Sequence, residues 1–170
     1  MYSQLSKLKM KGNIKLDLTP AEKEKLRANK IKYSEISEYL VDDLVALLDI
    51  PEARAKEIRA LAEFQSVPSV GIKFAQDLIS LGYYSLDELK DKDGAKLTDD
   101  LELSAGTWID PCVEDQFRLV VDYANNRDDR KKWWDFTEER KQFRINNGYP
   151  STRPKKAWFE LEKYQNKIGR

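Results

Sequence analysis

The sequence predicts an all-α fold, and three observations lead to this expectation. Apolar residues recur at helical spacing along much of the chain, as they do between Tyr33 and Leu48. Helix start signals, in which a capping residue is followed by proline or glutamate, stand in front of several of these stretches. A short turn with proline and glycine, Val67–Gly71, separates two amphipathic segments. A chain of 170 residues with 41% hydrophobic residues is large enough to bury a core.

The first predicted helices lie before residue 65. Thr19-Pro20-Ala21-Glu22 combines an N-cap threonine, a proline at the first helical position and a capping-box glutamate, and so predicts a helix over 20–29. The segment from Tyr33 to Leu48 predicts one helix, or two short helices broken near Val41. The run from Ala53 to Phe64 predicts another amphipathic helix. The core residues expected between Tyr33 and Leu48 are Ile36, Leu40, Leu44, Leu47 and Leu48.

The stretch from Val67 to Phe74 predicts a helix-hairpin-helix. A turn that opens into a helix exposes backbone N–H groups at the positive helix end, where a phosphate can bind. Gly71 would let the backbone turn tightly and approach such a ligand, and Lys73 adds a mobile positive charge. The same turn also suits any compact helical domain that changes direction. The nucleic-acid-binding residues predicted here are Ser69, Val70, Gly71, Ile72 and Lys73.

A weak repeat supports two hairpins in tandem. Ile50-Pro51 recurs seventeen residues later as Val67-Pro68, with apolar residues at matching offsets from each proline. The first copy has no glycine and places Glu52 where a phosphate would approach, so we expect it to be structural. In the second copy Ser69 replaces the usual first glycine, and its hydroxyl can donate to a phosphate or cap the helix.

Two further helix starts lie in the middle of the chain. Ser85-Leu86-Asp87-Glu88 is a capping box for a helix that reaches about Lys90, and Lys92-Asp93-Gly94 predicts a surface turn. Asp110-Pro111 caps and starts a helix whose apolar stripe runs to Ala124.

The segment from Arg127 mixes basic and aromatic residues, as in Arg130-Lys131-Lys132-Trp133-Trp134. Charges that follow phosphates and rings that stack on bases suit single strands, which adds Lys131 and Lys132 to the predicted nucleic-acid-binding residues. Residues 155–167 predict a last helix. In the alternative interpretation the aromatic residues pack this segment onto the core and leave its charges as a solvated outer face. The residues concerned are Trp133, Trp134, Phe136, Trp158 and Phe159.

Charge is distributed unevenly, although the formal net charge is zero. Residues 1–33 carry nine basic and three acidic side chains, residues 34–126 eight and twenty, and residues 127–170 thirteen and seven. The hairpin lies in the acidic section, which opposes phosphate binding. The basic ends could extend a nucleic-acid footprint, fold against the acidic section or bind a protein.

Composition and motifs exclude several kinds of chemistry. Histidine is absent, and the single cysteine, Cys112, allows no internal disulfide or thiolate metal site; we expect it to be a buried packing residue. Asp110, Glu114 and Asp115 do not predict a metal site, because the first caps a helix and the other two point to different faces. Glu114 and Arg118 are instead spaced for an ion pair. With no Walker or dinucleotide motif, we expect no enzyme, cofactor or metal.

No apolar run approaches the roughly 18 residues that span a bilayer, and the N-terminus lacks the apolar segment of a signal peptide. We therefore expect a cytoplasmic protein without a membrane partner.

Three stretches carry a resemblance to a known family: Phe64–Gly82, Ser85–Leu89 and Ile109–Arg118. Together they resemble the pathogenicity locus family of bacterial helix-hairpin-helix proteins over about residues 60–136. The most specific part is the pattern of Asp110, Cys112, Val113, Asp115, Phe117 and Arg118. The resemblance implies an all-α fold and DNA association, and it implies no catalytic activity. Residues 1–59 resemble the leading hairpin of tandem helix-hairpin-helix domains, in degenerate form.

These observations predict a basic N-terminal segment (1–18), a tandem helix-hairpin-helix domain (19–126) and a helical, aromatic-rich basic extension packed on the core (127–170). The expected function is non-enzymatic DNA binding, without sequence specificity, through phosphate contacts at the second hairpin. The alternative is a protein–protein interaction scaffold with the same fold. The strandedness of the nucleic acid, the choice between DNA and RNA, and the oligomeric state stay open.

Overall fold

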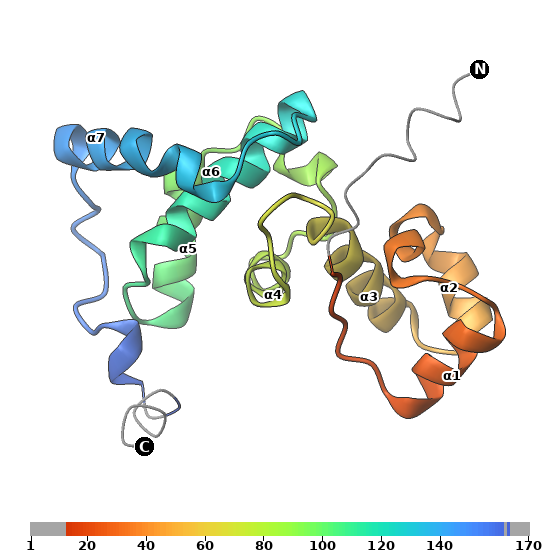
Figure 1. The fold of residues 1–170 in the computed structure, drawn as a ribbon. Helices are drawn as coiled ribbons and strands as arrows, with labels where there is room; N and C mark the ends of the chain where they lie inside the picture. Colours follow the sequence, from red (N-terminus) through yellow and green to blue (C-terminus); the bar gives the residue numbers. More distant parts are fainter. Residues whose placement is uncertain (1–12, 162, 164–170) are drawn as a thin grey trace. The chain divides into compact units, whose positions relative to one another are not determined.

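The computed structural model describes residues 13–161 and residue 163, and the chain divides into two compact units, Met1–Ile79 and Ser80–Arg170. Over these described residues the regular structure consists of helices and short 3-10 turns, which confirms the all-α prediction (Figure 1). Extended pairing in the same residues is limited to one isolated parallel bridge between Trp108 and Ala157.

The described residues of unit 1, from 13 onward, form four α-helices and one 3-10 turn. Its elements are α1 (Pro20–Ala28), η2 (Tyr33–Glu38), α2 (Val41–Leu48), α3 (Glu52–Phe64) and α4 (Ile72–Ser80), the last residue of which belongs to unit 2. The capping box at the start of α1 is confirmed: Thr19 accepts from the Glu22 N–H, and the Glu22 carboxylate accepts from the Thr19 N–H at 2.9 Å. Pro20 is the first helical residue, as predicted.

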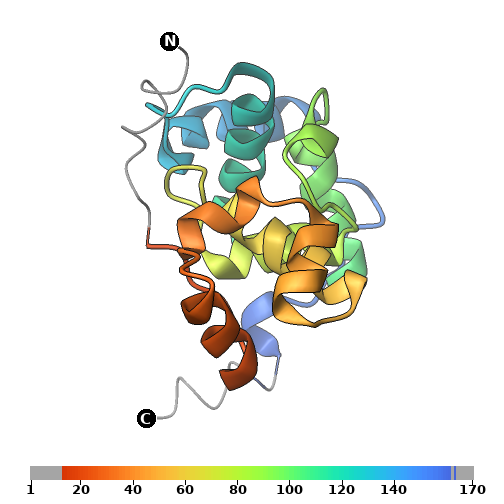
Figure 2. The ribbon, with the colours of Figure 1, turned by 90° about the vertical axis from the view of Figure 1, so that its right-hand side faces the viewer.

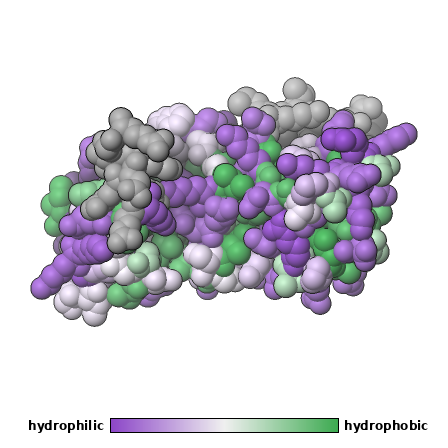
Figure 3. All heavy atoms as spheres, turned by 90° about the horizontal axis from the view of Figure 1, so that it is seen from below, coloured by the Kyte–Doolittle hydropathy of each residue, from purple (hydrophilic) through white to green (hydrophobic). Residues whose placement is uncertain are grey.

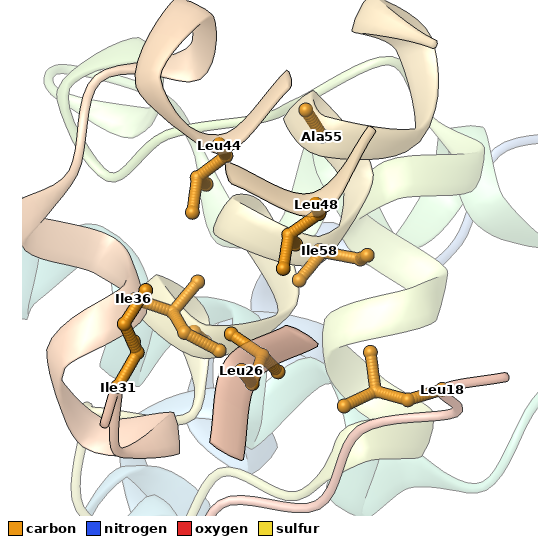
Figure 4. Packing of buried hydrophobic residues seen from close by; sticks show 9 residues of the cluster. Leu18, Leu26, Ile31, Ile36, Leu44, Leu48, Ala55 and Ile58 are labelled. Carbon is orange, nitrogen blue, oxygen red and sulfur yellow. The ribbon is translucent and has the colours of Figure 1, made fainter. Parts of the chain in front are cut away.

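The core of unit 1 is a cluster of aliphatic side chains between α1, η2, α2 and α3 (Figure 4). Burying each of the larger side chains contributes roughly 1.5–3 kcal/mol to folding. Its members are Leu18, Leu26, Ile31, Ile36, Leu44, Leu48, Ala55, Ile58 and Ala62.

The expected core position of Leu40 is wrong, because its side chain is 71% exposed. Tyr39 and Leu40 are extended and separate η2 from α2, so the helical phase that begins at Ile36 does not continue to Leu40. The break near Val41 therefore divides the segment into two elements, which is the second of the two predicted arrangements.

A buried ion pair joins α1 to α3. The Glu22 side chain is 6% exposed, and Arg54 donates from Nε to its Oε1 at 2.9 Å and from Nη2 to its Oε2 at 3.0 Å. These hydrogen bonds from Arg54 lower the pKa of Glu22. The bidentate geometry fixes the orientation of one helix on the other.

Three α-helices and three 3-10 turns are named among the described residues of unit 2. They are η3 (Asp87–Leu89), α5 (Gly94–Ala105), α6 (Pro111–Asn126), η4 (Trp133–Phe136), α7 (Thr137–Asn147) and η5 (Trp158–Glu160). The hydrogen bonds of the Ser85–Glu88 capping box are present, but they start only the short turn η3. Asp110 caps α6 by accepting from the Cys112 N–H at 2.9 Å, as predicted.

Helix α5 was not predicted. A surface turn was expected at Lys92–Gly94, and this expectation is wrong for Gly94, which begins the helix. Asp93 caps α5 by accepting from the Ala95 N–H at 2.9 Å, and Gly94 is its buried first residue. A Cβ atom on Gly94 would lie 2.8 Å from Arg118 Cγ and 2.9 Å from the Arg118 backbone nitrogen. Glycine at this position therefore lets α5 approach α6 closely.

The chain from Gly148 onward differs from the expected last helix over 155–167. Described residues 155–161 form the bridge at Ala157 and the turn η5 instead of a helix, because the backbone pairs with Trp108. Lys163, also inside the predicted range, is helical, and the rest of residues 162–167 and most of the predicted N-terminal segment lie outside the described residues.

None of the described helices combines the length and the hydrophobicity needed to span a bilayer. On the face drawn in Figure 3, hydrophilic residues surround smaller apolar patches.

Candidate nucleic-acid interface

Two turns in unit 1 have the same backbone form. The first, Asp49-Ile50-Pro51, joins α2 to α3, and the second, Ser69-Val70-Gly71, leads into α4. Asp49 and Ser69 both adopt left-handed conformations, with φ of 53° and 64°. The carbonyl of Pro51 accepts from the Ala55 N–H at 3.0 Å, and that of Gly71 accepts from the Ala75 N–H at 3.1 Å.

The structural repeat is therefore twenty residues long, and the predicted spacing of seventeen is wrong. Pro51 lies directly before α3, whereas Pro68 stands inside the second turn and α4 begins only at Ile72. Aligning the two prolines thus shifts the second helix out of register. With the corrected spacing, Ala55 and Ala75 are equivalent, as are Ile58 and Leu78, and all four side chains are fully buried.

The second turn has one buried side chain and several exposed residues. Val70 is 8% exposed and anchors the turn, whereas Ser69, Gly71 and Lys73 are exposed and Ile72 is half-buried. Gly71 is outside the left-handed region, so the tight turning expected of it occurs at Ser69 instead. A Cβ atom on Gly71 would meet nothing within 4 Å, which leaves room for a ligand against the backbone.

The first turn has the same shape but different chemistry. Pro51 stands where the second turn has Gly71, so that position has no N–H to donate. Glu52 replaces Ile72 and adds a carboxylate at the helix start. On the other side of the turn, Lys25 Nζ donates to the Leu48 carbonyl at 3.0 Å and contacts Asp49 Oδ2 at 3.3 Å, so the end of α2 is capped from within unit 1.

Lys131 and Lys132, the other two predicted residues, belong to unit 2. Lys131 Nζ lies 3.1 Å from both carboxylate oxygens of Asp122 and 5.6 Å from the Phe136 ring centroid. The Lys132 backbone N–H donates to Asp135 at 2.8 Å and so helps to start η4. The five turn residues are thus contiguous in unit 1, while Lys131 holds a structural ion pair in the other unit.

Sequence reasoning missed how the C-terminal extension is held. Helix α7 has no buried residue and packs against α6 (Figure 2) through arginines that meet buried carboxylates. Arg144 Nε lies 2.8 Å from Glu114, and Arg144 Nη2 lies 3.0 Å from Asp99. Arg140 Nε lies 2.6 Å from Asp115. The carboxyl groups of Glu114 and Asp115 are each 1% exposed, so unpaired they would cost several kcal/mol.

The segment that follows α7 is held by the same kind of arginine–carboxylate contact. Arg153 donates to both oxygens of Glu102 at 2.8 and 2.9 Å, and its guanidinium lies 3.6 Å from the Tyr149 ring centroid. These arginines are partly or fully covered and act as counterions for the acidic section. The alternative interpretation, with charges as a solvated outer face, is therefore wrong for them. Of the aromatic residues, Phe136 is buried, but Trp134 is 54% and Phe159 45% exposed.

The pattern that carries the family resemblance lies at this attachment. Asp110 caps α6, Phe117 is fully buried, and Asp115 accepts from Thr137 Oγ1 at 2.9 Å as well as from Arg140. Arg118 pairs with Glu114 at 2.9 Å, as predicted, and also with Glu139. Two residues of this pattern, Asp115 and Arg118, therefore hold α7 against α6.

Cys112 is half-buried rather than buried, and burial together with its contact to Asp110 raises the pKa of its thiol to about 12. Across residues 13–161 and 163, no three or more cysteine, aspartate or glutamate side chains form a group that could hold a metal ion.

Comparison with known proteins assigns the family. No match to the chain was found among curated proteins or among solved structures. The model of the pathogenicity locus family matches residues 57–142, from the middle of α3 into α7. This match spans half of the chain and includes the second turn and the attachment of α7, and the chain therefore belongs to the pathogenicity locus family.

Proposed function

We propose that this chain is a cytoplasmic tandem helix-hairpin-helix protein that binds DNA without sequence specificity through phosphate contacts at Ser69–Lys73. Backbone N–H groups at the start of α4 and the Lys73 ammonium would contact the phosphate, and few base edges would be reached. The proposed role is binding rather than catalysis. The chain has no histidine, and the raised pKa of Cys112 keeps its thiol protonated near neutral pH.

The observation that carries this proposal is the difference between two turns of one backbone form. The first turn has a proline without an N–H to donate and a carboxylate at the helix start, both of which oppose an approaching phosphate, and its nearby Lys25 ammonium already donates to the Leu48 carbonyl. The second turn has a glycine with open space beside it and an exposed lysine at the second helical position. A turn needed only to change the chain direction requires neither feature, because the first turn changes direction without them.

The proposal is tested by fluorescence anisotropy with labelled duplex and single-stranded DNA at two salt concentrations. We expect micromolar binding of the duplex that weakens with salt and is lost in Gly71→Asp and Lys73→Glu. Gly71→Ala fills the open space with one methyl group and should weaken binding without unfolding unit 1.

Two matched controls use the same side-chain changes elsewhere in unit 1. Ala53→Asp places the carboxylate at the first turn, and Lys23→Glu reverses an exposed charge on α1. Both should bind like the wild type, with the fold of every variant checked by circular dichroism. Equal losses in Lys23→Glu and Lys73→Glu would contradict a site at the second turn, and absence of binding at low salt would favour the scaffold role.

A further inference from the structure

Most basic side chains of the C-terminal extension are already engaged inside unit 2. Arg140, Arg144 and Arg153 neutralise buried carboxylates. Four more pairs involve Arg127 with Asp87, Arg130 with Asp128, Lys131 with Asp122 and Lys141 with Glu138. Lys155 and Lys156 are exposed, and neither forms an ion pair within the part of the chain that the structure describes.

These two lysines lie three and four residues before an exposed aromatic ring. Phe159 is 45% exposed, and its ring meets Trp108 edge-on at 5.6 Å between centroids and Trp158 edge-on at 5.7 Å. We call the group formed by Lys155, Lys156 and these three rings the Phe159 patch. A partly exposed ring, with two lysines close by in the sequence that form no ion pair within the described residues, is suited to a ligand with planar groups and negative charge.

The backbone beneath the Phe159 patch is fixed. The Trp108 N–H donates to the Lys156 carbonyl at 2.9 Å, and the Trp158 N–H donates to the Trp108 carbonyl at 2.9 Å. Ala157 between them is 3% exposed, and the Glu160 carboxylate accepts from its N–H. Because the patch is held in place before any ligand arrives, binding costs little ordering of the protein.

Trp134 and Tyr149, the other exposed rings in the described part of unit 2, have different surroundings. Trp134 is 54% exposed, but two of the three basic residues just before it, Arg130 and Lys131, are paired with Asp128 and Asp122. Tyr149 has two arginines against its ring, Arg153 at 3.6 Å and Arg144 at 4.2 Å from the centroid. Trp134 therefore has less unpaired positive charge close to it in the sequence. On Tyr149, arginines occupy ring surface on which a base could otherwise stack.

We infer that the Phe159 patch binds single-stranded nucleic acid, with an unpaired base stacked on Phe159 and neighbouring phosphates held by Lys155 and Lys156. Bases in a duplex are stacked on each other and do not offer a free face, so the patch selects unpaired nucleotides. This inference rests on the proposed function, because it requires that the protein binds nucleic acid. It adds that unit 2 binds the single-stranded form.

The test uses fluorescence anisotropy to measure the affinity of the full chain and its variants for a labelled thymidine oligonucleotide and for a labelled duplex. Phe159→Ala should lose about 5-fold to 100-fold in affinity for the single strand, the range for removing one base stack, and should bind the duplex unchanged. The double substitution Lys155→Gln with Lys156→Gln should reduce the slope of log affinity against log salt by about 1.4 for the single strand.

Matched controls come from α7 of the same unit. Ile145→Ala removes an exposed apolar side chain, 77% exposed, and Lys141→Gln removes an exposed charge; both should leave single-strand binding unchanged. Equal losses in Ile145→Ala and Phe159→Ala would overturn the inference. So would unchanged oligonucleotide binding in every variant, the result expected if the patch served a protein partner.

Gly71→Asp separates this inference from the proposed function. If it abolishes duplex binding while single-strand binding still depends on Phe159, both sites are supported. If the wild type binds duplex through the second turn but does not bind the single strand, the inference fails and the proposed function stands.

Discussion

Two glycines of this chain occupy opposite environments. Gly94 faces Arg118, whose backbone nitrogen would lie 2.9 Å from an added Cβ atom, whereas the space beside Gly71 is open. The first glycine is thus required by packing between α5 and α6. The second is not required by its neighbours, which is the reason to connect it with a ligand.

The variant Gly94→Ala should lower the free energy of unfolding by roughly 1–3 kcal/mol, the usual cost of forcing an extra carbon into a packed contact. Urea denaturation followed by circular dichroism measures this difference. Gly71→Ala is the control with the same chemical change, and its unfolding free energy should not fall. Equal stability of the two variants would contradict the close approach of α5 to α6.

Arg144 is the residue whose removal should be most costly in unit 2. Its guanidinium meets Glu114 and Asp99, and burial already raises the pKa of Asp99. Arg144→Met keeps much of the stem but leaves Glu114 buried without this partner, so we expect a loss of about 3–5 kcal/mol in unfolding free energy. Lys141→Met on the same helix should change it by less than about 0.5 kcal/mol, because its ion pair is exposed. Similar changes in unfolding free energy for the two substitutions would show that the buried ion pair of Arg144 does not stabilise unit 2 more than an exposed one.

At the scale of elements, the two units attach their helices by different means. Helices α1, α2 and α3 share an aliphatic cluster, and one ion pair orients α1 on α3. Helix α7 has no buried residue and depends on arginine–carboxylate pairs. Directional polar contacts hold one orientation but contribute less net stability than apolar burial, so α7 should separate from unit 2 more readily than α6.

Hydrogen exchange followed by mass spectrometry tests this difference. Amides of α7 should exchange through local opening, faster than those of α6, and Arg140→Gln should accelerate α7 further while leaving α6 unchanged. Exchange of both helices at one common rate would show instead that they open only together.

The ion pair between α1 and α3 predicts a pH dependence. The pKa of Glu22 is lower in the folded chain than its usual value of 4.5, so the unfolded chain binds this proton more readily. The stabilisation is fully present above about pH 4.5 and is lost as the pH falls through the folded pKa. Urea denaturation at pH 7 and in steps below pH 4.5 should show a smaller acid-dependent loss in Glu22→Gln than in the wild type. Parallel losses would contradict a role for this carboxylate.

At the scale of the whole molecule, the basic extension neutralises part of the acidic section. Arg140, Arg144 and Arg153 are engaged internally, so these three positive charges are not available to a nucleic acid, although the chain has 30 basic residues. We therefore expect log affinity for duplex DNA to fall against log salt with a slope no steeper than about −4, since each phosphate contact contributes about −0.9. Anisotropy titrations over a salt series measure it; a steeper slope would show that the paired arginines also contact the duplex.

Local signals in the sequence predicted local structure well. The capping box at Thr19, the cap at Asp110 and the pair of Glu114 with Arg118 each depend on residues within four positions of one another. The contiguous residues Ser69–Lys73 could likewise be singled out from the sequence, whereas their nucleic-acid binding stays a prediction.

Features that depend on distant residues could not be predicted in this way. Helix α5 begins at a glycine that only its contact with Arg118 explains. Arg153 and Glu102 are 51 residues apart, and nothing in the charge pattern indicates which arginine meets which carboxylate. The true repeat length depends on a left-handed conformation at Ser69, which serine seldom adopts.

The half-buried thiol of Cys112 has a practical consequence for labelling. Burial and the contact with Asp110 raise the pKa of this thiol to about 12, so the reactive thiolate is much scarcer at pH 7 than in a free cysteine. A cysteine placed at an exposed position such as Lys73 or Lys155 would therefore react with a maleimide far faster than the native one. We therefore expect a fluorophore to attach selectively at such an introduced cysteine while Cys112 is kept in the chain.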